Sequence, residues 1–141
     1  MKLKSIFATI LICLIVAVLI LAALPFLMYN KDAPLPKARI DIAAIVNAIK
    51  SFQGDYGFIP SGENSNIVRI LTGDNPKKIV YLNFRRLEEN PSVMFDPWKT
   101  PYQFEFFQGT NFIIRSAGRN KIFGTMDDVV FNSVSNDFVK P

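Results

Sequence analysis

The first pattern in the chain is a long apolar run near its start. Residues 6–28 are apolar apart from Thr9, with Cys13 and Pro25 as further interruptions. A run of about two dozen apolar residues is long enough to cross a hydrocarbon core of ~30 Å as a helix. We therefore expect residues 1–30 to form a membrane anchor, which Pro25 kinks or ends because it removes a helical hydrogen bond.

The charges around this run predict its orientation. Lys2 and Lys4 precede it and favour a cytoplasmic N-terminus, and Lys31, Lys37 and Arg39 on the far side weaken that prediction without reversing it. A single pass then places the rest of the chain outside the cytoplasm. A cleaved secretory signal is the alternative, but such a signal has a shorter apolar core than this run.

A second pattern, with helical periodicity, begins after a proline-containing break at residues 31–36. Two prolines this close are not expected inside a regular helix. Beyond the break, apolar residues recur at spacings of four and three, which indicates one apolar face of a helix. The residues of this face are Ala38, Ile42, Ile45, Ile49 and Phe52. We expect a helix over about residues 37–53 that packs on a sheet and ends near Gly54 and Gly57.

A short helix is expected over about residues 65–72, because Asn64, Ser65 and Asn66 are favourable helix caps and apolar residues follow them. Residues 77–87 are ambiguous between helix and strand. Farther on, Asp96 and Pro97 fit the start of a type I turn, in which aspartate accepts local N–H bonds. Trp98, the only tryptophan, is expected to cover the small core.

Alternation of apolar and polar residues predicts a small antiparallel sheet in the last third of the chain. Residues 102–107 read as a half-buried strand, residues 108–111 as a turn, and residues 112–116 as the returning strand. Residues 129–131 supply a third. The sequence therefore predicts an α+β fold, whose head (residues 37–141) is one long helix packed on this sheet.

The composition removes several classes of function. The sequence has no histidine, which excludes a Ser-His-Asp triad and histidine-ligated zinc. The net charge of +4 comes from scattered residues, so we expect no nucleic-acid partner. A small hydrolase with Asp55, Glu63 or Glu105 as paired carboxylates is the enzymatic alternative. No nucleophile motif supports it, and we expect no enzymatic activity.

The segment between the last two predicted strands carries several oxygen-bearing side chains. They belong to Ser116, Asn120, Thr125, Asp127 and Asp128. A Ca²⁺ ion is bound by six to eight oxygens of such groups, and two adjacent carboxylates repel each other unless a cation or hydrogen-bond donors lie between them. The spacing is compatible with a calcium site, and also with a solvated turn whose aspartates accept backbone N–H bonds.

Taken together, these segments resemble the major pseudopilin of type II secretion, the G subunit, and its pilin-like relatives. The resemblance is carried by residues 20–25, residues 38–60, Asp96-Pro97-Trp98 with Pro101-Tyr102, and residues 116–128. It implies a long N-terminal helix that lies half in the membrane, a small antiparallel sheet packed on the second half of that helix, and a calcium-ordered loop near the C-terminal end. Such subunits stack by their helices into a short periplasmic filament that helps to export folded proteins.

The resemblance also implies a set of calcium ligands. They are the carbonyl of Ile114 and the side chains of Ser116, Asn120, Asp127 and Asp128. Asn120 stands where the family usually has aspartate, and fewer charged ligands should weaken the affinity for calcium. In the turn after Trp98, Lys99 stands where the family usually has glycine, which suggests a less strained turn in this chain.

Two functions follow as expectations. In the first, the chain is a non-enzymatic pseudopilin-like subunit of a secretion apparatus, held in the inner membrane by a single pass with its head in the periplasm. Its partners are then the membrane, other apparatus subunits and further copies of itself in a filament. In the second, it is an anchored extracytoplasmic binding or accessory module that does not polymerise. Family members carry a glutamate early in the apolar run, and residues 1–30 contain no acidic residue. That departure favours the second function.

Overall fold

The computed structural model describes residues 12–19, 34–83, 92–107 and 109–140. Its contacts divide the chain into two units, Met1–Lys31 and Asp32–Pro141, and each is described by itself. In the first unit, residues 12–19 are helical. None of the helices within the described ranges combines the length and the apolar character that a membrane crossing requires. Most of the anchor predicted over residues 6–28 lies outside the described residues.

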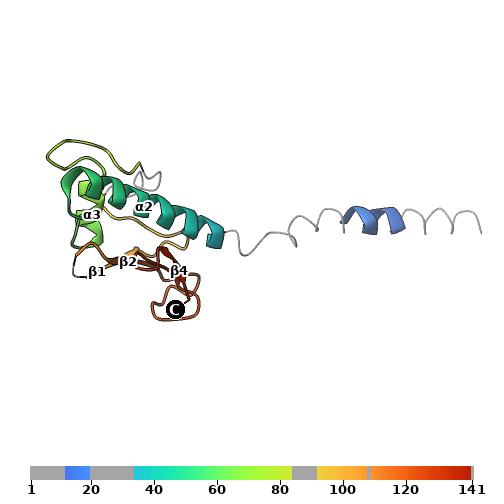
Figure 1. The fold of residues 1–141 in the computed structure, drawn as a ribbon. Helices are drawn as coiled ribbons and strands as arrows, with labels where there is room; N and C mark the ends of the chain where they lie inside the picture. Colours follow the sequence, from blue (N-terminus) through green and yellow to red (C-terminus); the bar gives the residue numbers. More distant parts are fainter. Residues whose placement is uncertain (1–11, 20–33, 84–91, 108, 141) are drawn as a thin grey trace, which may run out of the picture. The chain divides into compact units, whose positions relative to one another are not determined.

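The long helix of the second unit, α2, runs over Pro34–Tyr56 and is longer than predicted at both ends (Figure 1). The break predicted at residues 31–36 is therefore partly wrong, since its last three residues are helical, while residues 31–33 lie outside the described ranges. The first N–H groups of a helix have no partner within the helix, so prolines in the first turn cost little. At the other end, the N–H of Gly57 donates to the Gln53 carbonyl at 2.8 Å.

The sheet has four antiparallel strands in the order β1-β2-β3-β4. Strands β1 (Gln103–Phe106), β2 (Phe112–Ser116) and β3 (Val129–Asn132) correspond to the three predicted strands. Strand β4 (Asp137–Val139) was not predicted and pairs with β3. The core lies between α2 and the sheet, as Figure 1 shows. The predicted fold class, with one long helix across a small antiparallel sheet, is confirmed for this unit.

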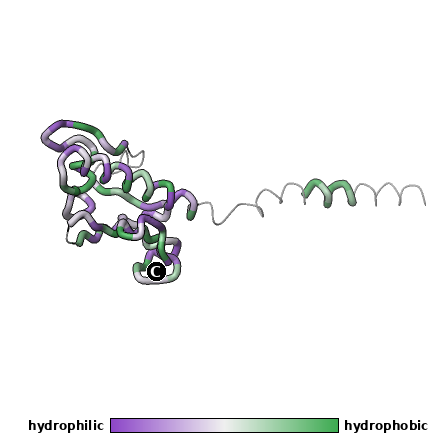
Figure 2. Tube along the Cα trace, in the orientation of Figure 1, coloured by the Kyte–Doolittle hydropathy of each residue, from purple (hydrophilic) through white to green (hydrophobic). Residues whose placement is uncertain are grey.

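The predicted apolar face of α2 supplies much of the core. Each of its five residues is at most 3% exposed: Ala38, Ile42, Ile45, Ile49 and Phe52. Figure 2 shows how apolar and polar residues alternate along this helix. All the buried core residues of the described ranges lie between Ala38 and Phe131. The unit Asp32–Pro141 therefore contains its own core, and burial of this apolar area is what drives its folding.

The short helix α3 (Asn64–Leu71) lies close to its predicted position, but its start differs from the prediction. Its N-cap is Glu63, which makes no side-chain capping bond. The Asn64 amide instead donates to the carbonyls of Met94 at 3.0 Å and Tyr102 at 2.8 Å, and its oxygen accepts the Met94 N–H at 2.7 Å. This side chain thus joins α3 to the segment that enters β1. Residues 78–83 form neither helix nor strand, and residues 84–91 are outside the described ranges.

The turn after Phe95 behaves as predicted at its start and differs at its end. One carboxylate oxygen of Asp96 accepts the N–H groups of Trp98 at 2.9 Å and Thr100 at 2.8 Å. Trp98 packs against the core, which confirms its covering role. Lys99, however, has φ of 68°, in the left-handed region that costs a side-chain-bearing residue about 1–2 kcal/mol. The expectation of a less strained turn is therefore wrong, because the turn keeps the conformation that suits glycine.

Candidate functional site

The candidate site is the β2–β3 loop, residues 117–128. Its two ends are held together at Gly118, where φ is +67° and where a Cβ atom would lie 1.9 Å from the carbonyl oxygen of Asp127. Only glycine allows two backbone segments to approach this closely. Two further residues of the loop, Lys121 and Gly124, also have positive φ. The chain is therefore folded back on itself in a compact loop that starts at the end of one strand and ends at the beginning of the next.

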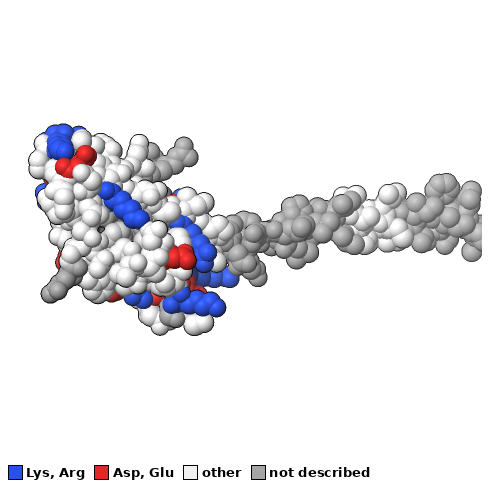
Figure 3. Space-filling model, viewed as in Figure 1, with Lys and Arg blue, Asp and Glu red and all other residues white. Residues whose placement is uncertain are grey.

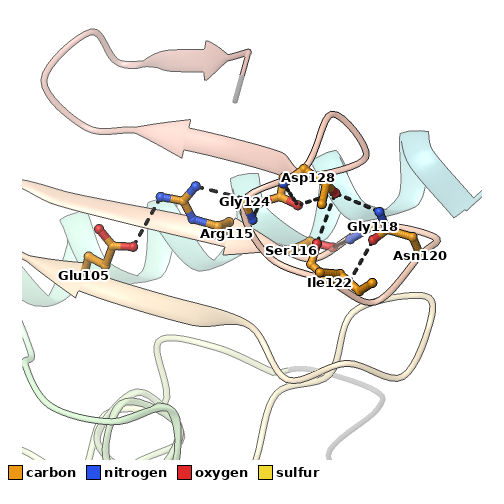
Figure 4. A network of polar contacts seen from close by, with 9 residues as sticks. Glu105, Arg115, Ser116, Gly118, Asn120, Ile122, Gly124 and Asp128 are labelled. Atoms are coloured by element: carbon orange, nitrogen blue, oxygen red, sulfur yellow. Dashed lines mark hydrogen bonds and ion pairs between the residues drawn. The ribbon is translucent and has the colours of Figure 1, made fainter.

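Asp128, the last residue of the loop, is the buried centre of this arrangement (Figure 4). Its side chain is 0% exposed. One carboxylate oxygen accepts the Gly124 N–H at 2.9 Å and lies 3.7 Å from a guanidinium nitrogen of Arg115. The other oxygen accepts the Thr125 hydroxyl at 3.3 Å. The negative charge of Asp128 is thus stabilised by donors on both sides, as a buried carboxylate requires.

Asn120 and Asp127 form the exposed side of the loop. The Asn120 backbone N–H donates to the Asp127 carboxylate at 3.2 Å, and the Asn120 amide donates to the Thr125 hydroxyl at 2.8 Å. The amide oxygen of Asn120 accepts the Ile122 N–H at 2.8 Å. Because Thr125 also contacts Asp128, four of the oxygen-bearing side chains are connected within one loop. The two aspartates take different donors, which limits their mutual repulsion.

The other two predicted ligands belong to strand β2 and lie deeper. Ile114 is 0% exposed and pairs with Phe104 of β1 and Phe131 of β3. Ser116 is also fully buried, and its hydroxyl donates to the carboxylate of Asp96 at 2.6 Å. The structure therefore gathers Asn120, Asp127 and Asp128 in the loop, while Ser116 faces the neighbouring turn.

Two residues of the site were not predicted from the sequence. Asp96 is 0% exposed and connects its own turn to the base of the loop through Ser116. Arg115, on β2, donates to Glu105 at 3.2 Å and lies beside Asp128. The position of Asp96 before a proline predicted its hydrogen bonds within the turn, but not its hydrogen bond with Ser116. The sequence places Arg115 on the predicted strand that precedes the loop with the two aspartates. Its contact with Asp128 can be inferred only when the register between the two strands is known.

Two of the three carboxylates considered for a hydrolase, Asp55 and Glu105, each lie beside a cationic side chain. Asp55, near the end of α2, accepts the Tyr81 hydroxyl at 2.6 Å and lies 3.8 Å from the Lys77 ammonium. Partial burial and the Asp55 carboxylate raise the pKa of the Tyr81 phenol. Glu105 is engaged by Arg115. Figure 3 shows acidic and basic side chains interspersed over the drawn face.

The site's surface is apolar at its tip. Ile122 is 61% exposed and Met126 is 82% exposed, although both lie in a loop that is held by its own hydrogen bonds. The loop therefore combines oxygen-bearing side chains that hydrogen-bond within it and two exposed apolar side chains.

Comparison with known proteins points to one family. A family model described as type II secretion system (T2SS), protein G, matches residues 26–132. No curated protein and no solved structure gives a match. The matched range covers α2, the first three strands and the whole β2–β3 loop. The chain therefore belongs to the type II secretion system protein G family, the family of the major pseudopilin.

Proposed function

We propose that this chain is a non-enzymatic structural subunit that polymerises into the filament of a type II secretion apparatus. The family is that of a structural pseudopilin, and it implies association with other subunits of the apparatus. The observation that carries the proposal is the family match over a unit whose long helix lies across a small antiparallel sheet. The ion-paired carboxylates Asp55 and Glu105 support a structural role, because they are engaged by cations rather than by each other.

The proposal includes a membrane anchor. Residues 6–28 are long and apolar enough to cross the bilayer once, and the lysines before them favour a cytoplasmic N-terminus. The unit Asp32–Pro141 is then exposed to the periplasm. This arrangement is supported by the apolar run and by the family, whose members are anchored in the inner membrane with a periplasmic domain. The exposed tip residues Ile122 and Met126 are candidates for contacts with other subunits.

Cross-linking through the native cysteine tests polymerisation. Cys13 is the only cysteine of the sequence and lies in the apolar run, on the helical residues 12–19. Subunits that stack by their N-terminal helices must bring copies of this residue near one another. We expect a bifunctional maleimide to produce covalent dimers of the full-length chain in membranes that contain the assembled apparatus, because one thiol per chain can join two copies. A Cys13→Ser variant, which removes the reactive thiol alone, is the control and is expected to give monomers.

The second candidate function is an anchored module that does not polymerise. It is favoured by one observation, the absence of an acidic residue from residues 1–30. A carboxylate within a membrane segment is retained where it has a partner, and neighbouring subunits provide one. Such a module would still fold, bind the membrane and contact the apparatus. It would give, at most, cross-links to a different partner protein and no dimers of itself.

We further propose that the β2–β3 loop holds a calcium ion. The candidate ligands are the carbonyl of Ile114 and the side chains of Ser116, Asn120, Asp127 and Asp128. The donor chemistry fits, because the loop presents carboxylate, amide and hydroxyl oxygens that are already connected around Thr125. Bound calcium would supply positive charge to the two adjacent carboxylates and fix the loop that presents the apolar tip.

Thermal unfolding tests the calcium proposal. A ligand that binds only the folded state raises stability by about 2.7 kcal/mol at 100 times its dissociation constant, which corresponds to roughly 10 °C in a unit of this size. We expect such a rise for residues 32–141 in millimolar calcium relative to chelator. An Asp127→Asn variant keeps an acceptor for the Asn120 N–H and removes the charge, so its rise should be much smaller. Identical melting curves with and without calcium would remove the proposal.

A further inference from the structure

The side chain of Arg115 joins the sheet to the base of the β2–β3 loop. Arg115 pairs with Gln103 of β1 in the strand register, and Glu105 lies two residues along that strand, on the same face. One guanidinium nitrogen lies 3.2 Å from the Glu105 carboxylate, and the other lies 3.7 Å from Asp128. The guanidinium is therefore shared between a half-exposed carboxylate on β1 and a buried one at the entrance to β3.

Of these two carboxylates, Asp128 is the one that depends on a cation. Its side chain is 0% exposed, whereas that of Glu105 is 38% exposed and can be solvated by water. Among the described residues, Arg115 is the only cationic side chain within ion-pair distance of Asp128. A buried carboxylate without a positive charge nearby is strongly disfavoured. The positive charge that stabilises Asp128, at the end of the loop, is thus supplied by Arg115 of the same chain.

The same carboxylate is a candidate calcium ligand, so two cations would act on one group. We propose that Arg115 is a built-in counter-ion of the β2–β3 loop, which holds Asp128 when calcium is absent and lowers the calcium affinity of the loop when it is present. This inference rests on the proposed calcium site. It follows from charge: the proposed ligands include two carboxylates, Asp127 and Asp128, and the guanidinium of Arg115 lies within ion-pair distance of one of them, where it would repel a bound cation.

Charge-neutral and charge-conserving variants of Arg115 test this competition. The experiment measures calcium binding to residues 32–141 by titration calorimetry, together with melting in chelator. Arg115→Gln removes the charge at similar length, so we expect calcium to bind roughly tenfold more tightly. In chelator the same variant should melt roughly 5 °C or more below the parent. Arg115→Lys keeps a cation, and its calcium affinity should remain near that of the parent.

Glu105→Gln is the matched variant on the other side of the guanidinium. It frees Arg115 to pair with Asp128 alone, so calcium affinity should fall by about threefold. Because it leaves Arg115 and the loop unchanged, it also tests the inference if Arg115→Gln does not fold. A purely structural role for Arg115 predicts lower melting temperatures and no change in calcium affinity.

The outcomes separate this inference from the calcium proposal. Equal calcium affinities for the parent and Arg115→Gln overturn the role of Arg115 and leave the calcium site standing. Binding by Arg115→Gln, with none by the parent, supports the role of Arg115 and removes calcium from the native loop. A lack of binding by both proteins overturns both statements.

Discussion

Replacing Gly118 by alanine is expected to be among the most destabilising single substitutions in this protein. The new Cβ atom would lie 1.9 Å from the Asp127 carbonyl oxygen and 2.6 Å from the Asp127 carbonyl carbon, and backbone cannot move aside as a flexible side chain can. The positive φ adds strain of about 1–2 kcal/mol. We expect a loss of about 3–5 kcal/mol in the free energy of unfolding, measured by urea denaturation of residues 32–141.

Gly124→Ala is the control for this prediction. Gly124 lies in the same loop, has φ of +81°, and a Cβ atom there meets nothing within 4 Å. The substitution therefore imposes the backbone strain without the collision and should cost about 1 kcal/mol. Similar losses for the two variants would show that the close approach of residues 118 and 127 does not hold the loop together.

The second large effect is expected at Asp96. Its carboxylate is 0% exposed and accepts the Trp98 N–H, the Thr100 N–H and the Ser116 hydroxyl, the last at 2.6 Å. Alanine leaves all three buried or half-buried donors without this acceptor. Hydrogen bonds to a charged group contribute about 1.5–3 kcal/mol each, but bonds to one carboxylate do not add fully, so we expect a loss of about 3–5 kcal/mol. Trp98, the only tryptophan, lies in the affected turn and provides a fluorescence signal for unfolding.

Ser116→Ala removes a single one of these bonds and should cost about 1–2 kcal/mol. The double variant then tells whether the turn and the loop are coupled through this pair. If they are, the two losses should fall short of adding by about 1 kcal/mol or more, because the second substitution removes a bond already broken. Strict additivity would mean that Asp96 organises its own turn and does not support the base of the β2–β3 loop.

The elements that were predicted correctly are those whose signal is repeated along the chain. The face of α2 has five apolar residues at helical spacing, and each is buried as its spacing indicated. Strand β2 alternates between buried and half-buried residues over its whole length, which a period of two predicts. In both cases the same spacing is repeated at several positions, so one residue that departs from it does not change the predicted element.

The differences concern short segments and single side chains. Strand β4 has only Asp137–Val139, too few residues to show a period, and pairing with β3 is what makes it a strand. The start of α2 was placed too late because its prolines were read as a break, although they occupy the first turn. Asn64 was read as a cap because its type suits one, while tertiary contacts with Met94 and Tyr102 determine its role.

In the candidate site, too, the grouping of residues within one segment could be predicted from the sequence, whereas contacts between segments could not. The polar residues of the loop could be recognised from the sequence as one segment, and Asn120, Asp127 and Asp128 do lie together. Nothing in the sequence indicates that Ser116 faces Asp96, since the two are brought together by the antiparallel bridge between Phe95 and Pro101 and by the sheet. The Arg115–Asp128 pair likewise depends on how β2 and β3 are aligned, with Arg115 opposite Val130.

The most direct test of the proposed function is the cross-linking pattern of the native cysteine in membranes with an assembled apparatus. If the chain is a polymerising subunit, Cys13 should yield covalent dimers of the chain, the largest product that one thiol per chain allows, and Cys13→Ser should abolish them. Cysteine-dependent products that contain one copy of the chain and a different protein, with no dimers of the chain itself, would contradict polymerisation and favour the accessory module.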